Sequence, residues 1–247
     1  TAGKGIVHSE MFPLLNDAQP NPLELFQIWL NLPASSKMSE PYFTMLWSQD
    51  LPRMTITDGH GRLAEVAVVA GRLAPAEGAG APVDALPPPP SSWAAQAGSD
   101  VAIWTSKLEP GAQWTLPAAE GQRGTRRMLY FFKGSRVTVA GQAVTGHAAL
   151  ELRAGNAAVM TNTGADTAEF LLLQGRPIAE PVVQYGPFVM NTQAEIAQTM
   201  AEYQRTQFGG WSFDQTAPVH GKQPQRFARH PDGRVETPDE LAAGAST

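Results

Sequence analysis

Glycine and proline recur at short intervals along the chain and divide it into short stretches with strand character. The 247 residues include 23 glycines and 21 prolines. Some stretches alternate apolar and polar residues, and others are continuous apolar runs bounded by glycine. Short strands with turn signals at this spacing are typical of a β-sandwich or a β-barrel. The predicted strands lie within 25–32, 53–59, 64–71, 101–108, 126–134, 135–144, 156–162 and 168–175.

One segment interrupts the strand pattern. Residues 81–100 are rich in proline, alanine and serine and contain four consecutive prolines. Such a run cannot join the interior of a sheet, and it favours an extended, semi-rigid chain. We therefore predict a linker at 76–99 that joins a β domain at 1–75 to a second β domain at 100–178. The alternative is a long surface loop within one domain.

A helical pattern follows the second β segment. Thr192 and Glu195 have the spacing of a capping box, and apolar residues recur after them at helical spacing. Gly209–Gly210 is expected to end this helix. We assign 179–213 to a crossing strand followed by the helix, and 214–247 to a polar tail that wraps the surface or is poorly ordered.

The overall charge and composition exclude several classes of protein. Lysine and arginine total 18 against 23 aspartates and glutamates, a net charge of −5, and the densest basic cluster is Arg123, Arg126 and Arg127. This balance argues against direct nucleic-acid binding. No apolar run reaches the length of about 18 residues expected of a membrane span. The lack of cysteine excludes disulfides and thiolate metal sites, and it fits the cytoplasmic location that we predict.

A histidine and a glutamate lie two residues apart near the start of the chain. In a β-strand, residues i and i+2 point to the same face, so His8 and Glu10 would project together. A neutral imidazole and a carboxylate can supply half of the ligands for a first-row metal ion. The spacing alone is also compatible with a solvated polar pair at the end of a strand.

Several stretches of the chain resemble the pirin family, whose members contain two cupin domains. They have the order and spacing of that family: TAGKGIVHSEM (1–11), LELFQIWLNLP (23–33), KMSEPYF (37–43), SSWAAQAGSDVAIWTSKLEPGAQWTLPA (91–118) and LLLQGRPIAEPVVQYGPFVMNTQAEI (171–196). The resemblance implies an all-β fold of two tandem cupin domains, each a double-stranded β-helix. It also implies a helix at the C-terminal end.

The resemblance also implies a metal centre in the first cupin. In this family three histidines and one glutamate hold a metal, commonly iron, and the last two ligands match His8 and Glu10. The family's first two ligands, an upstream His-x-His pair, have no counterpart here. We therefore expect an incomplete first cupin, through truncation, a companion chain or a late start. We also expect Fe(II), or another divalent metal, to bind weakly or not at all.

The second cupin is expected to hold no metal, as is usual in this family. On this interpretation Gln113 and Thr115 stand where a cupin carries a histidine pair, and neither is a strong ligand. His60 is assigned to an exposed hairpin turn between Asp58 and Gly61. His147, which follows Gly146, is assigned to a surface turn.

Five further residues are candidates for the lining of the metal cavity: Trp29, Phe43, Pro187, Phe188 and Met190. For Trp29 and Phe43 the alternative is packing in a hydrophobic core. For the other three it is packing between domains.

The resemblance implies one of two functions for the complete protein. The first is an oxygen-dependent dioxygenase of the quercetin 2,3-dioxygenase type, with a flavonol-like substrate and Glu10 as the catalytic base. The alternative is a redox-sensitive iron protein that regulates a transcription factor or a metabolic enzyme through protein contact. An inactive scaffold is the third possibility. The dioxygenase interpretation requires His8 and Glu10 to face a barrel interior and not bulk water.

Overall fold

The computed structural model describes residues 1–12, 14–75, 80–121, 124–211, 225–230 and 232–238. The chain forms two compact units. Unit 1 comprises Thr1–Met45 and Glu180–Thr247, and unit 2 comprises Leu46–Ala179. Each unit therefore has its own internal contacts.

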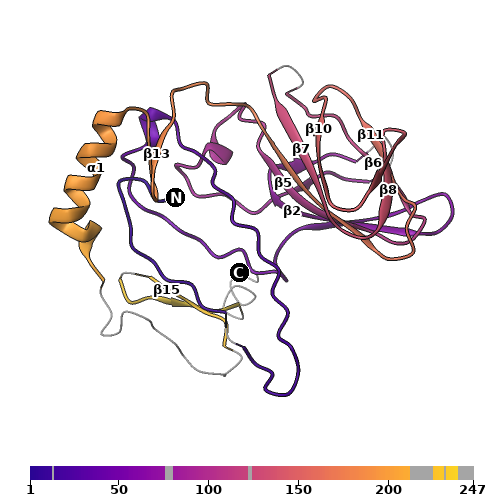
Figure 1. Ribbon diagram of the computed structural model, residues 1–247, viewed down its shortest axis with the longest axis horizontal. Helices are drawn as coiled ribbons and strands as arrows, with labels where there is room; N and C mark the ends of the chain where they lie inside the picture. The colour runs from indigo at the N-terminus through magenta and orange to yellow at the C-terminus, as the bar shows by residue number, and fades with distance from the viewer. Residues whose placement is uncertain (13, 76–79, 122–123, 212–224, 231, 239–247) are drawn as a thin grey trace. The chain divides into compact units, whose positions relative to one another are not determined.

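Unit 2 is a β-barrel built from two antiparallel sheets (Figure 1). The larger sheet has the strand order β1-β2-β5-β12-β7-β10, and the smaller has the order β6-β11-β8-β9. Two further short strands, β3 and β4, pair with each other and lie between β2 and β5 in the sequence. The strands are β1 (Arg53–Thr57), β2 (Leu63–Ala70), β3 (Arg72–Leu73), β4 (Val83–Asp84), β5 (Ala102–Leu108), β6 (Gln113–Leu116), β7 (Arg126–Lys133), β8 (Arg136–Val139), β9 (Gln142–Thr145), β10 (Ala148–Leu152), β11 (Ala158–Asn162) and β12 (Ala168–Gly175).

Alternation along the strands builds the hydrophobic core of the barrel. On β7, every second residue from Arg127 to Phe131 is buried, whereas the residues between them are partly exposed. Phe131 stacks on Phe170 of β12, with their ring centroids 5.1 Å apart, and both rings are fully buried. Core residues come from both sheets. The all-β prediction is therefore confirmed for unit 2.

The segment predicted to be a linker belongs to unit 2. Strand β2, before the segment, pairs directly with β5 after it, with Ala64 opposite Leu108. Within the segment β4 pairs with β3, and the indole N–H of Trp93 donates to the Arg176 carbonyl at 2.9 Å. The boundaries of the compact units therefore differ from the domain boundary predicted at 76–99, and the described residues 80–99 lie within unit 2. The physical reason is that an extended, proline-rich chain can cover a barrel through side-chain packing without joining its sheets.

Unit 1 contains the C-terminal helix and two short hairpins. Its elements are the 3-10 helix η1 (Ala34–Ser36), β13 (Val183–Tyr185), β14 (Phe188–Met190), α1 (Gln193–Thr206), the 3-10 turn η3 (Gln207–Gly209), β15 (Ala228–Arg229) and β16 (Val235–Glu236). The predicted capping box is confirmed, because Thr192 accepts from the Glu195 N–H and Glu195 accepts from the Thr192 N–H. With 14 residues, this α-helix of the described chain is too short to cross a bilayer.

One predicted strand is wrong in unit 1. Residues 25–32 form no strand, and apolar side chains from this stretch, including Leu25 and Trp29, are exposed. Side chains on both faces of this stretch are exposed to solvent, which is unusual for an apolar sequence that predicts a buried strand. A strand needs a neighbour for its backbone groups, and the described residues provide none at this position.

Part of the predicted polar tail has regular structure. Strands β15 and β16 form a hairpin within 214–247, in which His230 Nε2 lies 3.0 Å from Glu236 Oε2. The His230 ring also stacks on Phe43 at a centroid distance of 4.2 Å. Residues 212–224, 231 and 239–247 lie outside the described residues.

A nearly buried carboxylate on β12 forms ion pairs with lysines on the two neighbouring strands of the barrel. Glu169 of β12 pairs with Lys133 of β7 at 2.8 Å and with Lys107 of β5 at 3.4 Å. Burial by itself would raise the pKa of Glu169, but the hydrogen bond from Lys133 and the charges of both lysines outweigh it, and the pKa is lowered. A carboxyl group with a lowered pKa in the folded state stabilises that state while it remains ionised.

We expect Glu169→Gln to lower the free energy of unfolding by about 1–3 kcal/mol at pH 7, because a buried charged hydrogen-bond partner is lost. This difference should hold above the ordinary glutamate pKa of about 4.3 and shrink as the pH falls through the lowered pKa of the folded state. Urea unfolding at a series of pH values would measure it. Glu65→Gln is the control, since Glu65 pairs with Arg53 at the surface and such pairs contribute about 0–1 kcal/mol. An equal loss in both variants would contradict the prediction.

Candidate functional site

The pair singled out in the sequence lies at the surface of unit 1. His8 Nε2 is 3.8 Å from Glu10 Oε1, and the two side chains are 69% and 62% exposed. The segment that carries them belongs to no strand, and no barrel interior lies between them in the described part of the chain. The two groups therefore lie close to one another but in solvent, which is the arrangement least favourable to the dioxygenase interpretation in this chain.

Backbone hydrogen bonds fix the segment just before this pair. The N-terminal ammonium of Thr1 donates to the Tyr42 carbonyl at 2.7 Å, and the Tyr42 N–H donates back to the Thr1 carbonyl at 3.0 Å. The Lys4 N–H donates to the Ser39 carbonyl at 2.9 Å. Gly5 has a φ of +120° and packs against the ring of Phe208, where a Cβ atom would come closer than 3.0 Å. The motif is thus anchored up to Gly5.

The five candidate lining residues do not gather around His8 and Glu10 through any described contact. Trp29 is 55% exposed, and Phe43 stacks on His230. Phe188 packs against Tyr203 and Phe208, with ring centroids 5.9 and 6.1 Å away. Pro187 is exposed and Met190 is half-buried at the end of β14. Their assignment to a metal cavity stays a prediction, and the aromatic packing gives Phe188 a structural role.

The donor set fits half of a metal centre. His8 and Glu10 provide one imidazole and one carboxylate, which suits a first-row divalent ion. Among the described residues, no group of three or more histidine, cysteine, aspartate or glutamate side chains could hold a metal ion. Four ligands are the usual complement of a cupin site on the family resemblance, so these two residues would hold a metal only with additional donors.

The side chains of β6 that face the core of the second cupin are not the ones expected from the sequence. On β6 the residues Trp114 and Leu116 face the core, whereas Gln113 and Thr115 are exposed. The placement of Gln113 and Thr115 at the ligand positions was therefore wrong, because side chains two apart on this strand share its outer face. Trp114 and Leu116 carry no strong metal-binding groups. His60 and His147 are exposed in turns, as predicted.

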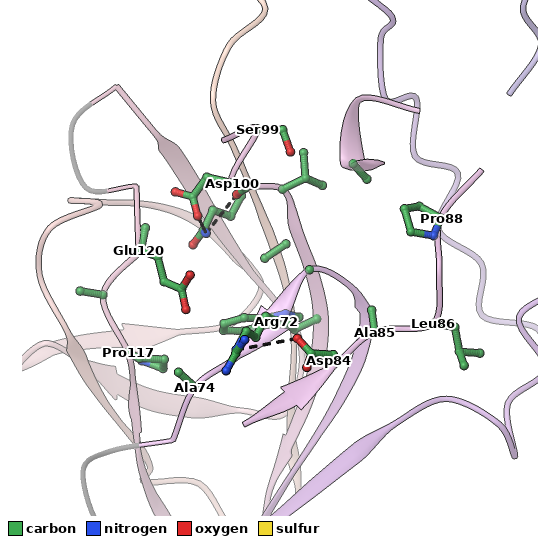
Figure 2. A pocket seen from close by; sticks show the side chains of 18 residues that line it. Arg72, Ala74, Asp84, Ala85, Leu86, Pro88, Ser99, Asp100, Pro117 and Glu120 are labelled. Carbon is green, nitrogen blue, oxygen red and sulfur yellow. Dashed lines mark hydrogen bonds and ion pairs between the residues drawn. The ribbon is translucent and has the colours of Figure 1, made fainter. Parts of the chain in front are cut away.

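The barrel of unit 2 contains a cavity that the sequence did not indicate. It has a volume of about 300 Å³ and is lined by residues that include Trp104, Gln174 and Asp100. Figure 2 shows Arg72 and Asp84 directed toward one another at 3.8 Å, with Asp100 and Glu120 on another side of the cavity. Gln174 Nε2 donates to Asp100 Oδ1 at 3.1 Å. Three carboxylates and one guanidinium therefore line this space.

Several buried polar atoms of unit 2 have no hydrogen-bond partner among the described residues. They include Trp104 Nε1, Gln174 Oε1 and all three guanidinium nitrogens of Arg127. Arg127 is only 1% exposed, and burial lowers its pKa, while the charge of Asp100 acts in the opposite direction. In the sequence, Arg127 belongs to the densest basic cluster, with Arg123 and Arg126. Its alternation with Leu129 and Phe131 was the signal that could have identified it as buried.

Comparison with known families decides the relationship. Residues 103–209 match the pirin C-terminal cupin domain. This part of the chain is a pirin C-terminal cupin domain. The matched pirin domain covers strands β5 to β14 and the helix α1, so it includes most of the barrel and the structured C-terminal part of unit 1.

Relatives extend the match beyond residues 103–209. A protein of Vibrio cholerae named "Putative quercetin 2,3-dioxygenase" is 35% identical over 217 residues, which cover 84% of this chain and 65% of that protein. Human pirin is 30% identical over 212 residues, 85% of this chain and 63% of its own length. A crystal structure of quercetin 2,3-dioxygenase from Acinetobacter baumannii has a TM-score of 0.54 and 30% identity over 73% of this chain and 55% of its own. The chain thus spans less than two thirds of each relative.

Proposed function

We propose that this pirin-family protein, when its first cupin is complete, is a metal-dependent dioxygenase of the quercetin 2,3-dioxygenase type. The observation that carries the proposal is the 35% identity to the Vibrio protein named "Putative quercetin 2,3-dioxygenase". In the described chain His8 and Glu10 are exposed to solvent, so the proposal concerns a protein in which additional chain encloses them. Its chemical support is the imidazole and carboxylate pair, typical of sites for first-row divalent metals. The names of the Vibrio and Acinetobacter relatives point to the same reaction.

The expected metal is Fe(II). When bound, it would act as a Lewis acid toward the 3-hydroxyl group of a flavonol-like substrate. His8 would hold the ion through a neutral imidazole nitrogen. Glu10 would hold the ion and accept the hydroxyl proton at a carboxylate oxygen, as a general base. A flat aromatic substrate needs apolar walls, for which Trp29, Phe43, Pro187, Phe188 and Met190 are the proposed candidates.

The proposal also includes a cytoplasmic location and no direct nucleic-acid partner. Its support is the absence of cysteine and a net charge of −5. A protein partner belongs to the alternative, regulatory function.

Oxygen uptake with quercetin tests the activity, measured on iron-loaded protein expressed from the complete gene. We expect Glu10→Ala to reduce the rate by about a hundredfold or more, because it removes both a ligand and the general base. His147→Ala is the matched control, since His147 is an exposed histidine in a turn of unit 2. Iron content measured on the same samples separates loss of metal from loss of catalysis.

Two outcomes would contradict this proposal. Uptake that persists unchanged in Glu10→Ala would remove Glu10 from the reaction. Iron binding at His8 and Glu10 without any quercetin-dependent uptake would reject the dioxygenase function and favour the redox-sensitive regulatory role.

A further inference from the structure

The ring of Phe208 lies directly over Gly5, three residues before His8. A Cβ atom on Gly5 would be 2.5 Å from Cγ of that ring and 2.6 Å from Cδ1 and Cδ2, which is too close for any side chain. Gly5 also has a φ of +120°, a conformation that residues with a Cβ atom rarely adopt. Glycine at this position therefore permits a contact that any other residue would prevent.

An unfavourable backbone turn holds the Phe208 ring in this place. Gln207 and Phe208 have φ angles of 51° and 50°, although neither is a glycine. This left-handed conformation brings Cβ too close to the following carbonyl oxygen. Thr206 Oγ1 accepts from the Phe208 N–H at 3.1 Å, and Gln207 Nε2 donates to the Tyr203 carbonyl at 2.8 Å, so the end of α1 stabilises the turn. Backbone strain of this kind is concentrated at functional sites.

Two further rings fix the orientation of Phe208. The ring of Tyr203 on α1 lies 5.1 Å from it, and that of Phe188 on β14 lies 6.1 Å from it in an edge-to-face arrangement. These contacts connect α1 and β14 to Phe208, and Phe208 connects them to Gly5. The C-terminal helix of unit 1 is thereby coupled to the motif that begins the chain.

A second glycine of the motif is confined in the same way. Gly3 has a φ of +53°, and a Cβ atom there would lie 2.1 Å from the Ser39 carbonyl oxygen. The Lys4 N–H donates to that same oxygen at 2.9 Å. Ser39 and Phe208 together therefore fix the backbone from Gly3 to Gly5.

We propose that Phe208 is a positioning residue for the metal-binding pair, because its ring fixes the direction in which the chain leaves Gly5 toward His8 and Glu10. Only two residues, both half-buried, separate Gly5 from His8, so a rotation at Gly5 would displace both donors together. Phe208 has no ligand atom of its own and acts through Gly5. The inference rests on the proposed function only through the assignment of His8 and Glu10 as metal ligands.

The test is anaerobic calorimetric titration of Fe(II) into metal-free protein expressed from the complete gene. We expect Phe208→Ala to weaken Fe(II) binding about tenfold, the effect typical of residues that orient metal ligands without binding the metal. Phe208→Tyr keeps the ring and should bind as the parent does. Tyr203→Leu is the matched control, since it removes a neighbouring ring of the same cluster and leaves Phe208 in place. It should lower the melting temperature with less than about a twofold change in Fe(II) affinity.

A double variant separates positioning from a general loss of stability. Gly5→Ala should also weaken Fe(II) binding, because the added methyl group meets the Phe208 ring. In Gly5→Ala combined with Phe208→Ala that collision is absent, so the loss should be clearly smaller than the product of the two single losses. The visible spectrum of the Co(II)-loaded protein reports the geometry of the metal ligands. It should change in Phe208→Ala and not in Tyr203→Leu.

Three results would overturn this role of Phe208. They are Fe(II) binding by Phe208→Ala as tight as that of the parent, single losses that multiply fully in the double variant, and a parent protein whose Fe(II) binding does not depend on His8. Fe(II) binding that depends on Phe208, but without quercetin-dependent oxygen uptake, would support the positioning role and reject the dioxygenase function. The two proposals can therefore fail separately.

Discussion

Phe170→Ala is expected to lower the free energy of unfolding of unit 2 by about 3–5 kcal/mol. Phe170 is fully buried on β12 and stacks on Phe131 of the neighbouring strand. Removing its ring takes apolar surface out of the core and leaves a cavity that the two strands can close only in part. Urea unfolding followed by tryptophan fluorescence would measure the loss.

Leu63→Ala provides the comparison for this variant. Leu63 begins β2 in the same barrel but is 42% exposed, so its truncation should cost much less than that of Phe170. Similar losses for both variants would mean that Phe170 does not occupy a close-packed core. The result would then count against the arrangement of the two sheets described above.

Gly71→Ala is expected to destabilise unit 2 by about 2–5 kcal/mol through strain and a direct clash. Gly71 lies between β2 and β3 with a φ of +80°, a conformation that costs an L-residue about 1–2 kcal/mol. A Cβ atom there would also come closer than 3.0 Å to the Val101 carbonyl oxygen, which is part of the backbone and cannot rotate away. Both penalties apply at once.

Gly61→Ala separates these two penalties. Gly61 has a φ of +78° in the β1–β2 turn, and a Cβ atom there would meet nothing within 4 Å. It should therefore show the conformational cost alone, about 1–2 kcal/mol. Thermal unfolding of both variants gives the comparison. Equal shifts in melting temperature would contradict the close approach of Gly71 to Val101.

The candidate sites differ in how well they could be identified from the sequence alone. The His-x-Glu motif was recognisable because its two residues lie two positions apart and belong to a stretch that resembles the pirin family. The cavity in unit 2 was not recognisable, because its lining residues Trp104 and Gln174 come from two strands that meet only through pairing. Gln113 and Thr115 were placed at the wrong register, since a shift of one residue moves a side chain to the other face.

Many secondary-structure elements of this protein can be predicted from local sequence patterns. An alternating run predicted β5, a continuous apolar run that ends at a glycine predicted β12, and Thr192 with Glu195 predicted the start of α1. These signals act over a few residues, where propensity and capping dominate.

Which strands pair depends on the tertiary fold. The fold pairs β2 with β5 across the proline-rich segment, leaves 25–32 outside any strand, and buries Arg127 in the barrel. The physical reason is that burial and backbone pairing depend on neighbours distant in sequence, which no local pattern specifies.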